Sequence, residues 1–393
     1  MSSVTMNGVT LVTTKKELKS FIQFPYDHYK KDAYWVPPLY IMQNDLVDVK
    51  KNPFYKRAKA AFFIAETNGR ISGRIAAIRN QAYIDHSGEN TGFFGFFECT
   101  ESQPVANLLI KVALDWLRDS GVSRVIGPAS PSMMDEIGVL VEGFESYPSV
   151  MMPYSKPYYD TLLKKAGLEK VMDMYAYRVH KDMVPFDRVE KAEKIVRQRT
   201  PGIHIRRVNL KKIDEESELI RQIFNAAWEK NWGFTPISKD EMEHLAQGLK
   251  LIIDTDFAHV AEINGEPVGF SIALPDINQV LARMNGKLFP TGIFKLLWYK
   301  RKINRVRTAL MGVVPEHQHK GIDMLMHREA IINGPKRDIN ESELSWLLET
   351  NNEMIRVAER LGAVREKVYR MYGTTLHQGK QPVPPERAES ALS

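Results

Sequence analysis

The sequence predicts an α/β protein built from two tandem copies of one unit, and three observations lead to this prediction. Residues 65–73 (AETNGRISG) and 261–269 (AEINGEPVG) share the pattern A-E-x-N-G-x-x-x-G, each between apolar runs typical of strands. The segments before and after these stretches match in order and kind, as an internal duplication requires. A chain of 393 residues is also long for one domain and natural for two.

In the first half, a helix-like segment leads to an aromatic turn before proline at residues 34–38 (YWVPP), and a hairpin follows at residues 68–69 (Asn-Gly). Asn-Gly between two strand-like runs is a strong hairpin signal, because a type I′ turn needs positive φ at both central residues. Further strands are predicted at 93–97 and 123–126. A helix ending in glycine and a last strand, together residues 158–179, complete the unit.

The second half repeats this order, with an aromatic turn at 232–236 (WGFTP), an Asn-Gly hairpin at 264–265 and a last helix and strand at 354–372. It differs by a Lys/Arg-rich insertion at 286–307. We expect the sheets of the two units to share a large apolar interface. The predicted organisation is an N-terminal domain (1–183), a linker (184–201), a C-terminal domain (202–376) and a flexible tail (377–393).

The composition is that of a packed globular protein, with 44% hydrophobic and 26% charged residues. A net charge of +6 suits a polyanionic ligand but is weaker than a dedicated nucleic-acid binder would show. The single cysteine, Cys99, allows neither a disulfide framework nor a cysteine metal site. The chain has no signal-peptide core and no run of 18 apolar residues, so we expect a soluble, cytoplasmic protein.

The most informative stretch is residues 308–327 (TALMGVVPEHQHKGIDMLMH), where an apolar run leads through a polar turn ending at Lys320-Gly321 into a helix start. The first backbone N–H groups of a helix have no intrahelical partner and lie at the positive end of its dipole. A glycine there lets a phosphate approach without a Cβ in the way. The stretch therefore predicts an anion site at a helix N-terminus.

The spacing of residues 313–321, V-x-P-x-x-Q-x-x-G, resembles the V-x-P-x-x-(Q/R)-x-x-G-x-(G/A) motif of the GNAT acyltransferases, whose loop wraps the pyrophosphate of acetyl-CoA or another acyl-CoA. Residues 344–351 (LSWLLETN) and 359–363 (ERLGA) resemble later segments of the same family. The resemblance implies two tandem GNAT-like mixed-sheet α/β domains and an acyl-CoA co-substrate. The CoA-binding residues that it implies are Met311, Val313, Gln318, His319, Lys320, Gly321, Ile322, Asp323 and Asn351.

The chain departs from the family pattern at two positions. The last Gly/Ala of the loop motif is Asp323, whose carboxylate would repel a diphosphate unless the side chain turned aside to cap the helix. A tyrosine that acts as general acid toward the CoA thiolate in many GNAT enzymes is Ala358 here, so either another group protonates the sulfur or the protein transfers nothing. In the first half, residues 98–104 (ECTESQP) carry two carboxylates and no Gln-x-x-Gly. We therefore expect one CoA site per chain.

In the reaction that the resemblance implies, a primary amine attacks the thioester, backbone N–H groups around residues 311–313 hold the oxyanion, and a base takes the amine proton. The base is not evident from the sequence. Glu349, at the end of one strand, and Tyr369 and Tyr372, on the last strand, are the candidates. Each could equally be a structural hydrogen bonder.

Four residues are candidate substrate contacts. Ser130 and Asp135 lie in a polar loop after a strand, at the carboxyl end where α/β sheets place ligands. An ordered connection whose hydroxyls satisfy the backbone explains this loop as well. Trp232 and Phe234 belong to the aromatic turn of the second half.

The insertion at 286–307 mixes aromatic and aliphatic side chains with Lys and Arg, a composition that suits contact with a membrane surface or cover over an acyl chain. A helix packed on its own domain with a solvated basic side explains it equally. His317, His319 and His327 lie close together in the sequence, but a metal site would need them to converge with carboxylates. We therefore predict no metal.

The leading hypothesis is an acyl-CoA-dependent N-acyltransferase that moves an acetyl or longer acyl group to a primary amine, either a small molecule or lipid-like. Two alternatives stay open. One is a CoA-binding protein that has lost its chemistry, favoured by Ala358 and Asp323. The other is a transferase that uses aminoacyl-tRNA, as tandem-GNAT peptidoglycan enzymes do. The sequence indicates neither the acceptor, the acyl length nor the oligomeric state.

Overall fold

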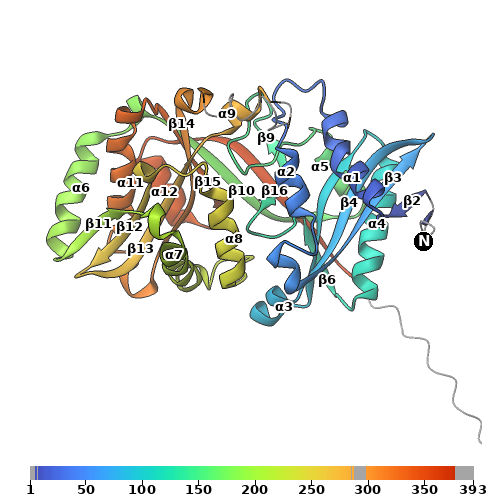
Figure 1. Cartoon of the computed structure of the whole chain (residues 1–393), viewed down its shortest axis with the longest axis horizontal. Coiled ribbons are helices and arrows are strands. Elements are labelled where there is room, and N and C mark those ends of the chain that lie inside the picture. Colours follow the sequence, from blue (N-terminus) through green and yellow to red (C-terminus); the bar gives the residue numbers. More distant parts are fainter. Residues whose placement is uncertain (1–4, 7, 285, 287–297, 377–393) are drawn as a thin grey trace, which may run out of the picture.

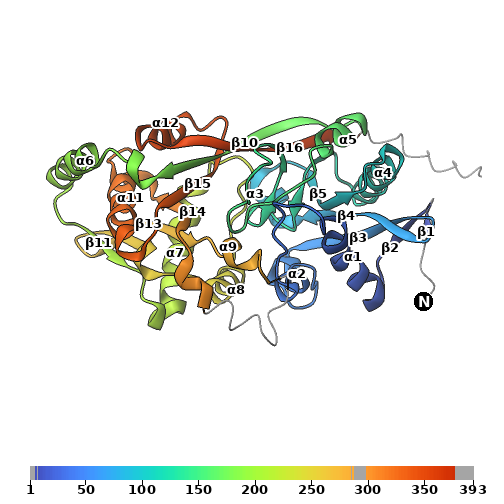
Figure 2. The same cartoon turned by 90° about the horizontal axis from the view of Figure 1, so that it is seen from above.

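The computed structural model describes residues 5–6, 8–284, 286 and 298–376, which form an elongated α/β molecule (Figures 1 and 2). The predicted tail, and residues 287–297 of the predicted insertion, lie outside the described residues. The helices and strands of the first half are β1 (Thr5–Met6), β2 (Val9–Leu11), α1 (Lys15–His28), α2 (Tyr40–Leu46), β3 (Ala58–Thr67), β4 (Arg70–Asn80), α3 (Gln81–Ser87), β5 (Thr91–Cys99), α4 (Gln103–Asp119), β6 (Arg124–Gly127), β7 (Ala129–Ser130), β8 (Glu136–Ile137), β9 (Val139–Glu142), α5 (Tyr159–Lys165) and β10 (Glu169–His180).

The second half follows with the same kinds of element. A helix, α6, occupies most of the predicted linker, and a helical turn stands between the glycine loop and β14. The elements are α6 (Phe186–Arg199), β11 (Ile203–Arg207), α7 (Ile213–Trp228), α8 (Lys239–Leu249), β12 (Ala258–Ile263), β13 (Glu266–Pro275), α9 (Asn278–Leu281), β14 (Arg305–Val313), α11 (Ile322–Asn333), β15 (Glu341–Leu348), α12 (Asn352–Arg360) and β16 (Val364–Thr375).

The repeated A-E-x-N-G-x-x-x-G stretches form matching hairpins, as predicted. In the first, Thr67 pairs with Arg70 across the turn, and in the second Ile263 pairs with Glu266. Asn68 and Asn264 both have positive φ, at 53° and 52°, as the turn requires. Both hairpins also have an irregular register just before the turn, between residues 65 and 66 and between residues 261 and 262.

We expected two sheets that share a large apolar interface, but the strands of both halves form one continuous 14-stranded sheet. Its order is β1-β2-β3-β4-β5-β6-β16-β10-β15-β14-β13-β12-β11, with β9 paired to β16. The two halves exchange their last strands. β16, the last strand of the second half, pairs with β6 of the first half, and β10, the last strand of the first half, pairs with β15 of the second half. The two exchanged strands also pair with each other. The exchange pairs sheet edges that would otherwise be open.

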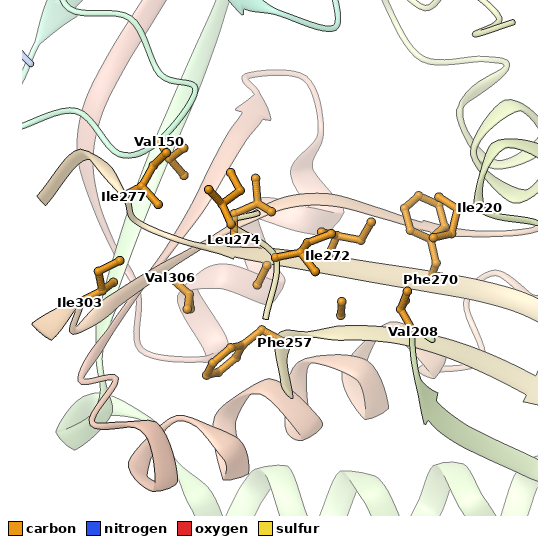
Figure 3. Packing of buried hydrophobic residues seen from close by; sticks show 14 of the residues in the cluster. Val150, Val208, Ile220, Phe257, Phe270, Ile272, Leu274, Ile277, Ile303 and Val306 are labelled. Carbon is orange, nitrogen blue, oxygen red and sulfur yellow. The ribbon is translucent and has the colours of Figure 1, made fainter. Parts of the chain in front are cut away.

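The apolar core continues across the junction between the halves. Figure 3 shows Val150, from the first half, beside Ile277 and Leu274 of the second half. All three are buried in one cluster that also holds Phe257 and Phe270. The sheet and the apolar core are both continuous between the halves. Loops of the first half are therefore held against the second half, where the glycine loop lies.

Candidate active site

Strands β14 and β15 separate in the middle of the second half. They pair in parallel from Arg305 with Glu341 to Thr308 with Leu344, and no pairing follows. At the same point β14 has a bulge, because its pairing with β13 skips Ala309. A bulge bends a strand and takes backbone groups out of the ladder. Backbone groups next to the opening are therefore available to a ligand.

A small pocket, with a cavity volume of about 40 Å³, lies at this opening. Its lining is mostly apolar, and three of its residues come from the first half of the chain. The lining residues are Met134, Asp135 and Met151 from the first half, and Trp228, Leu245, Leu249, Ile272, Leu274, Arg307, Ala309, Leu310 and Trp346 from the second. An apolar pocket with few polar groups suits a ligand with a hydrocarbon part.

Asp135 is a titratable group in this lining. Its carboxylate accepts hydrogen bonds from the hydroxyl of Ser132 at 2.5 Å and from the Ser132 N–H at 3.2 Å. Burial raises the pKa of Asp135 to about 6, and burial together with the Asp135 charge raises the pKa of Glu136 to about 7. A carboxylate with a pKa near 6 is ionised at neutral pH and is a better proton acceptor than an ordinary aspartate.

Arg307 lies where the strands separate and is buried. Its guanidinium donates to the Ser345 hydroxyl at 2.8 Å, to the Ser345 carbonyl at 3.2 Å and to the Val150 carbonyl at 3.1 Å. The buried Glu343 carboxylate accepts from Ser345 at 2.7 Å and from Ser149 at 2.6 Å. These bonds join β14, β15 and a loop of the first half, so Arg307 holds one wall of the pocket in place.

The glycine loop leads into α11 with its backbone donors free. Gly321 has φ 79° and Gln318 closes the loop by donating to the Val313 carbonyl at 3.0 Å. Among the described residues, the N–H groups of residues 319–323 have no hydrogen-bond partner. Free N–H groups at a helix N-terminus are the usual protein site for a phosphate. A Cβ at Gly321 would lie 2.7 Å from Val196 of α6, so the helix between the halves also requires a glycine here.

Asp323 does not cap α11, whose N-terminus carries no side-chain capping bond. Its charge acts instead on His327, one turn later. His327 is buried, and burial lowers its pKa although the Asp323 charge acts in the opposite direction. The Asp323 carboxylate therefore stays close to the helix terminus without consuming its donors.

In the first half, polar side chains fill the equivalent place after β5. The partly buried Glu98 carboxylate accepts from the hydroxyl of Tyr29 at 2.5 Å and from that of Tyr159 at 2.7 Å. The Cys99 N–H donates to the Tyr159 hydroxyl at 3.0 Å. A backbone donor at this end of β5 is thus already used, and a carboxylate lies where a diphosphate would be repelled. A single CoA site per chain stays a prediction.

The three residues predicted as catalytic do not line the pocket. Glu349 accepts from the Asp173 N–H at 3.0 Å and pairs with Lys170 at 2.7 Å. Tyr372 donates to Asp160 on α5. Tyr369 is fully buried between β9 and β10, and its hydroxyl has no hydrogen-bond partner among the described residues. The structure does not bring these three side chains together.

Of the four predicted substrate contacts, Asp135 lines the pocket and the other three do not. The Ser130 hydroxyl accepts from the Phe96 N–H at 2.9 Å. Phe234 is buried in the core of the second half, and Trp232 packs against a core cluster of the first half. Asn351, predicted to contact CoA, accepts from the Met354 N–H at 3.2 Å and so caps α12.

The pocket also contains residues that the sequence did not point to. Trp228 donates from its indole N–H to the Met311 carbonyl at 2.9 Å, and its ring lies 6.4 Å from that of Trp346. Met134 and Met151 close the pocket from the first half. Arg307 was assigned to the predicted insertion at 286–307, but the structure places it in β14, which begins at Arg305.

The described residues contain no group of three or more His, Cys, Asp or Glu side chains that could hold a metal ion. Two of the histidines weighed as metal ligands contact other side chains. The His319 Nδ1 lies 3.5 Å from a carboxylate oxygen of Glu353, and the His317 Nδ1 lies 3.1 Å from the Lys320 ammonium. No helix in the described part of the chain is both long enough and apolar enough to cross a membrane.

Two proteins resemble the chain over nearly its whole length. Protein YghO of Escherichia coli is 36% identical over 365 residues, which cover 91% of this chain and 93% of YghO. The bacterial ceramide synthase of Caulobacter vibrioides is 34% identical over 378 residues, which cover 94% of this chain and 97% of that protein. No model of a known protein family matches the chain.

Solved structures with the same fold are much more distant in sequence. A tandem GNAT protein from the clavulanic acid biosynthesis pathway superposes with a TM-score of 0.54 at 11% identity, over 93% of this chain and 98% of that one. A probable N-acyltransferase from Enterococcus faecalis gives a TM-score of 0.51 at 9% identity, over 94% of this chain and 72% of that one. The fold is therefore the tandem GNAT fold that the motif indicated.

Proposed function

The chain belongs to the family that contains YghO and the bacterial ceramide synthase, and from this premise we propose that it is an N-acyltransferase, which moves an acyl group from CoA to the primary amine of a long-chain, lipid-like acceptor. The observation that carries the proposal is the apolar pocket at the separation of β14 and β15, with Asp135 in its wall and the glycine loop at the end of β14.

The donor would bind along β14 and the start of α11. Its diphosphate would accept hydrogen bonds from the free N–H groups of residues 319–323. Its thioester would then lie by the bulge at Ala309, where backbone donors can hold an oxyanion. The cofactor is an acyl-CoA, and no metal is needed for this chemistry.

The acceptor would enter the apolar part of the pocket with its amine toward Asp135. A primary amine is protonated at neutral pH, so an ionised carboxylate both attracts it and can take a proton from it. The free amine then attacks the thioester carbon, and the carbon–nitrogen bond forms to give a tetrahedral intermediate with an oxyanion and a protonated nitrogen. As this intermediate collapses the carbon–sulfur bond breaks, the proton on nitrogen passes to the departing sulfur, and the amide and the CoA thiol are released. Asp135 then returns the first proton to solvent. Burial of hydrocarbon against the leucine and methionine side chains favours a long-chain acceptor at about 0.8 kcal/mol per CH₂ group.

Thiol release by the purified full-length protein tests this proposal. Acetyl-CoA and a long-chain acyl-CoA are each combined with a short primary amine and with a long-chain 2-amino alcohol, and the amide product is identified by mass. We expect thiol release that requires both substrates and is at least tenfold faster with the long-chain amine. Binding of CoA without thiol release for any pair would instead favour a CoA-binding protein that has lost its chemistry.

A further inference from the structure

Two large apolar side chains are exposed on segments that touch each other beside the pocket. Leu251 is 75% exposed and Trp298 is 72% exposed. The segments are joined because the Lys300 ammonium group donates to the Leu251 carbonyl at 3.1 Å. In the chain by itself these two side chains stay exposed to water and contribute no burial energy. Their exposure indicates a surface that contacts an apolar partner or a membrane.

The same two segments are rich in cations. Residues 249–253 (LKLII) and 298–305 (WYKRKINR) contain no acidic residue, and Asp254, which follows the first, is paired with Arg337 at 3.2 Å. The ring of Tyr299 lies between two cations, 4.8 Å from the Arg283 guanidinium and 5.6 Å from the Lys302 ammonium. We define the 251/298 patch by its members, which are Lys250, Leu251, Trp298, Tyr299, Lys300, Arg301 and Lys302.

The patch adjoins the pocket through α8. Leu245 and Leu249 of this helix line the pocket, and Leu251 follows two residues later. Helix α2 lies beside α8, as Figures 1 and 2 show. The imidazole of His244 on α8 lies 2.7 Å from the carboxylate of Asp45 on α2. On α2, Ile41 is also largely exposed.

We propose that the 251/298 patch docks the protein on a bilayer that contains anionic lipids, next to the entrance through which a lipid-like amine reaches the pocket. Trp and Tyr side chains favour the headgroup region, and cations beside them attract anionic headgroups by roughly 1 kcal/mol each. The proposal rests on the proposed function only for the nature of the acceptor.

Vesicle sedimentation with the full-length protein tests the docking without any substrate. The vesicles are phosphatidylcholine alone or phosphatidylcholine mixed with phosphatidylglycerol. We expect binding to the mixed vesicles that weakens with salt and is much weaker for phosphatidylcholine alone. Leu251→Ser/Trp298→Ser and Arg301→Glu/Lys302→Glu should each weaken binding by on the order of tenfold. Val364→Ser is the matched control, because Val364 is 66% exposed but belongs to β16, and it should bind as the parent does.

Absence of vesicle binding by the parent, or equal binding by the parent and both double variants, would overturn the docking proposal. An equal loss in Val364→Ser would overturn it as well, because binding would then be unspecific. Thiol release with a water-soluble amine in vesicle-free buffer separates this result from the proposed function. We expect both double variants to retain that activity and the melting temperature of the parent. Turnover without vesicle binding rejects the docking alone, and vesicle binding without turnover rejects the enzyme alone.

Discussion

At the residue scale, Asp135 is the residue that we propose as the base of the pocket. Because burial raises its pKa to about 6, the carboxylate becomes protonated as the pH falls below this value, and turnover should fall with it. Asp135→Asn should lower turnover by a factor of about 10² to 10⁴ and remove this acidic limb. Thiol release measured from about pH 5 to about pH 8 checks both expectations. Parental turnover in Asp135→Asn would exclude Asp135 as the base.

Stability provides the control for this variant. The pKa of Asp135 is higher in the folded chain than its ordinary value of 3.8, so its ionisation opposes folding above about pH 6 and has no effect once both states are protonated. Asp135→Asn should therefore melt at a higher temperature than the parent at pH 8, a difference that disappears toward about pH 4. A variant that is inactive because it is misfolded would melt lower at both values.

Gly321 is constrained by its backbone and by α6. Gly321→Ala places a Cβ in the left-handed region, which costs about 1–2 kcal/mol, and brings it 2.7 Å from Val196. Gly265→Ala is a matched control, since Gly265 has φ 87° with nothing within 4 Å of an added Cβ. We expect Gly321→Ala to destabilise the protein more than Gly265→Ala in thermal unfolding. In a Val196→Ala background, Gly321→Ala and Gly265→Ala should lower the melting temperature by the same amount. A larger effect of Gly321→Ala in that background would show that the contact with Val196 is not the cause.

At the scale of elements, the first turn of α11 combines free donors with a carboxylate. Two like charges about 5 Å apart repel by roughly 3 kcal/mol at an effective dielectric near 20, and solvent screens part of this at half-buried Asp323. Asp323→Asn should therefore tighten CoA binding several-fold in titration calorimetry, with one CoA per chain. Glu316→Gln, in the exposed part of the loop, should change the affinity less. Weaker binding by Asp323→Asn would contradict the electrostatic argument.

At the scale of the whole molecule, the exchange of β10 and β16 makes the halves depend on each other. Residues 1–201 alone would leave β6 and β10 without β16, and residues 202–393 alone would leave β15 and β16 without β10. Open central edges favour aggregation. We expect each half expressed alone to be insoluble or unfolded, and the two expressed together to form a complex of the size of the full chain. Cooperative thermal unfolding of either half alone would show that the exchange is dispensable.

The sequence by itself determined what depends on a few neighbouring residues. Asn68-Gly69 and Asn264-Gly265 predict hairpins because their φ preferences are local, and the spacing of Gln318 and Gly321 predicts a loop at a helix start for the same reason. Only the tertiary structure decided the exchange of β10 and β16, because the pairing of sheet edges leaves no periodic trace in either strand. It also decided the pocket, where Asp135 and Met151 meet Trp228 and Trp346 through long-range packing that local propensities do not encode.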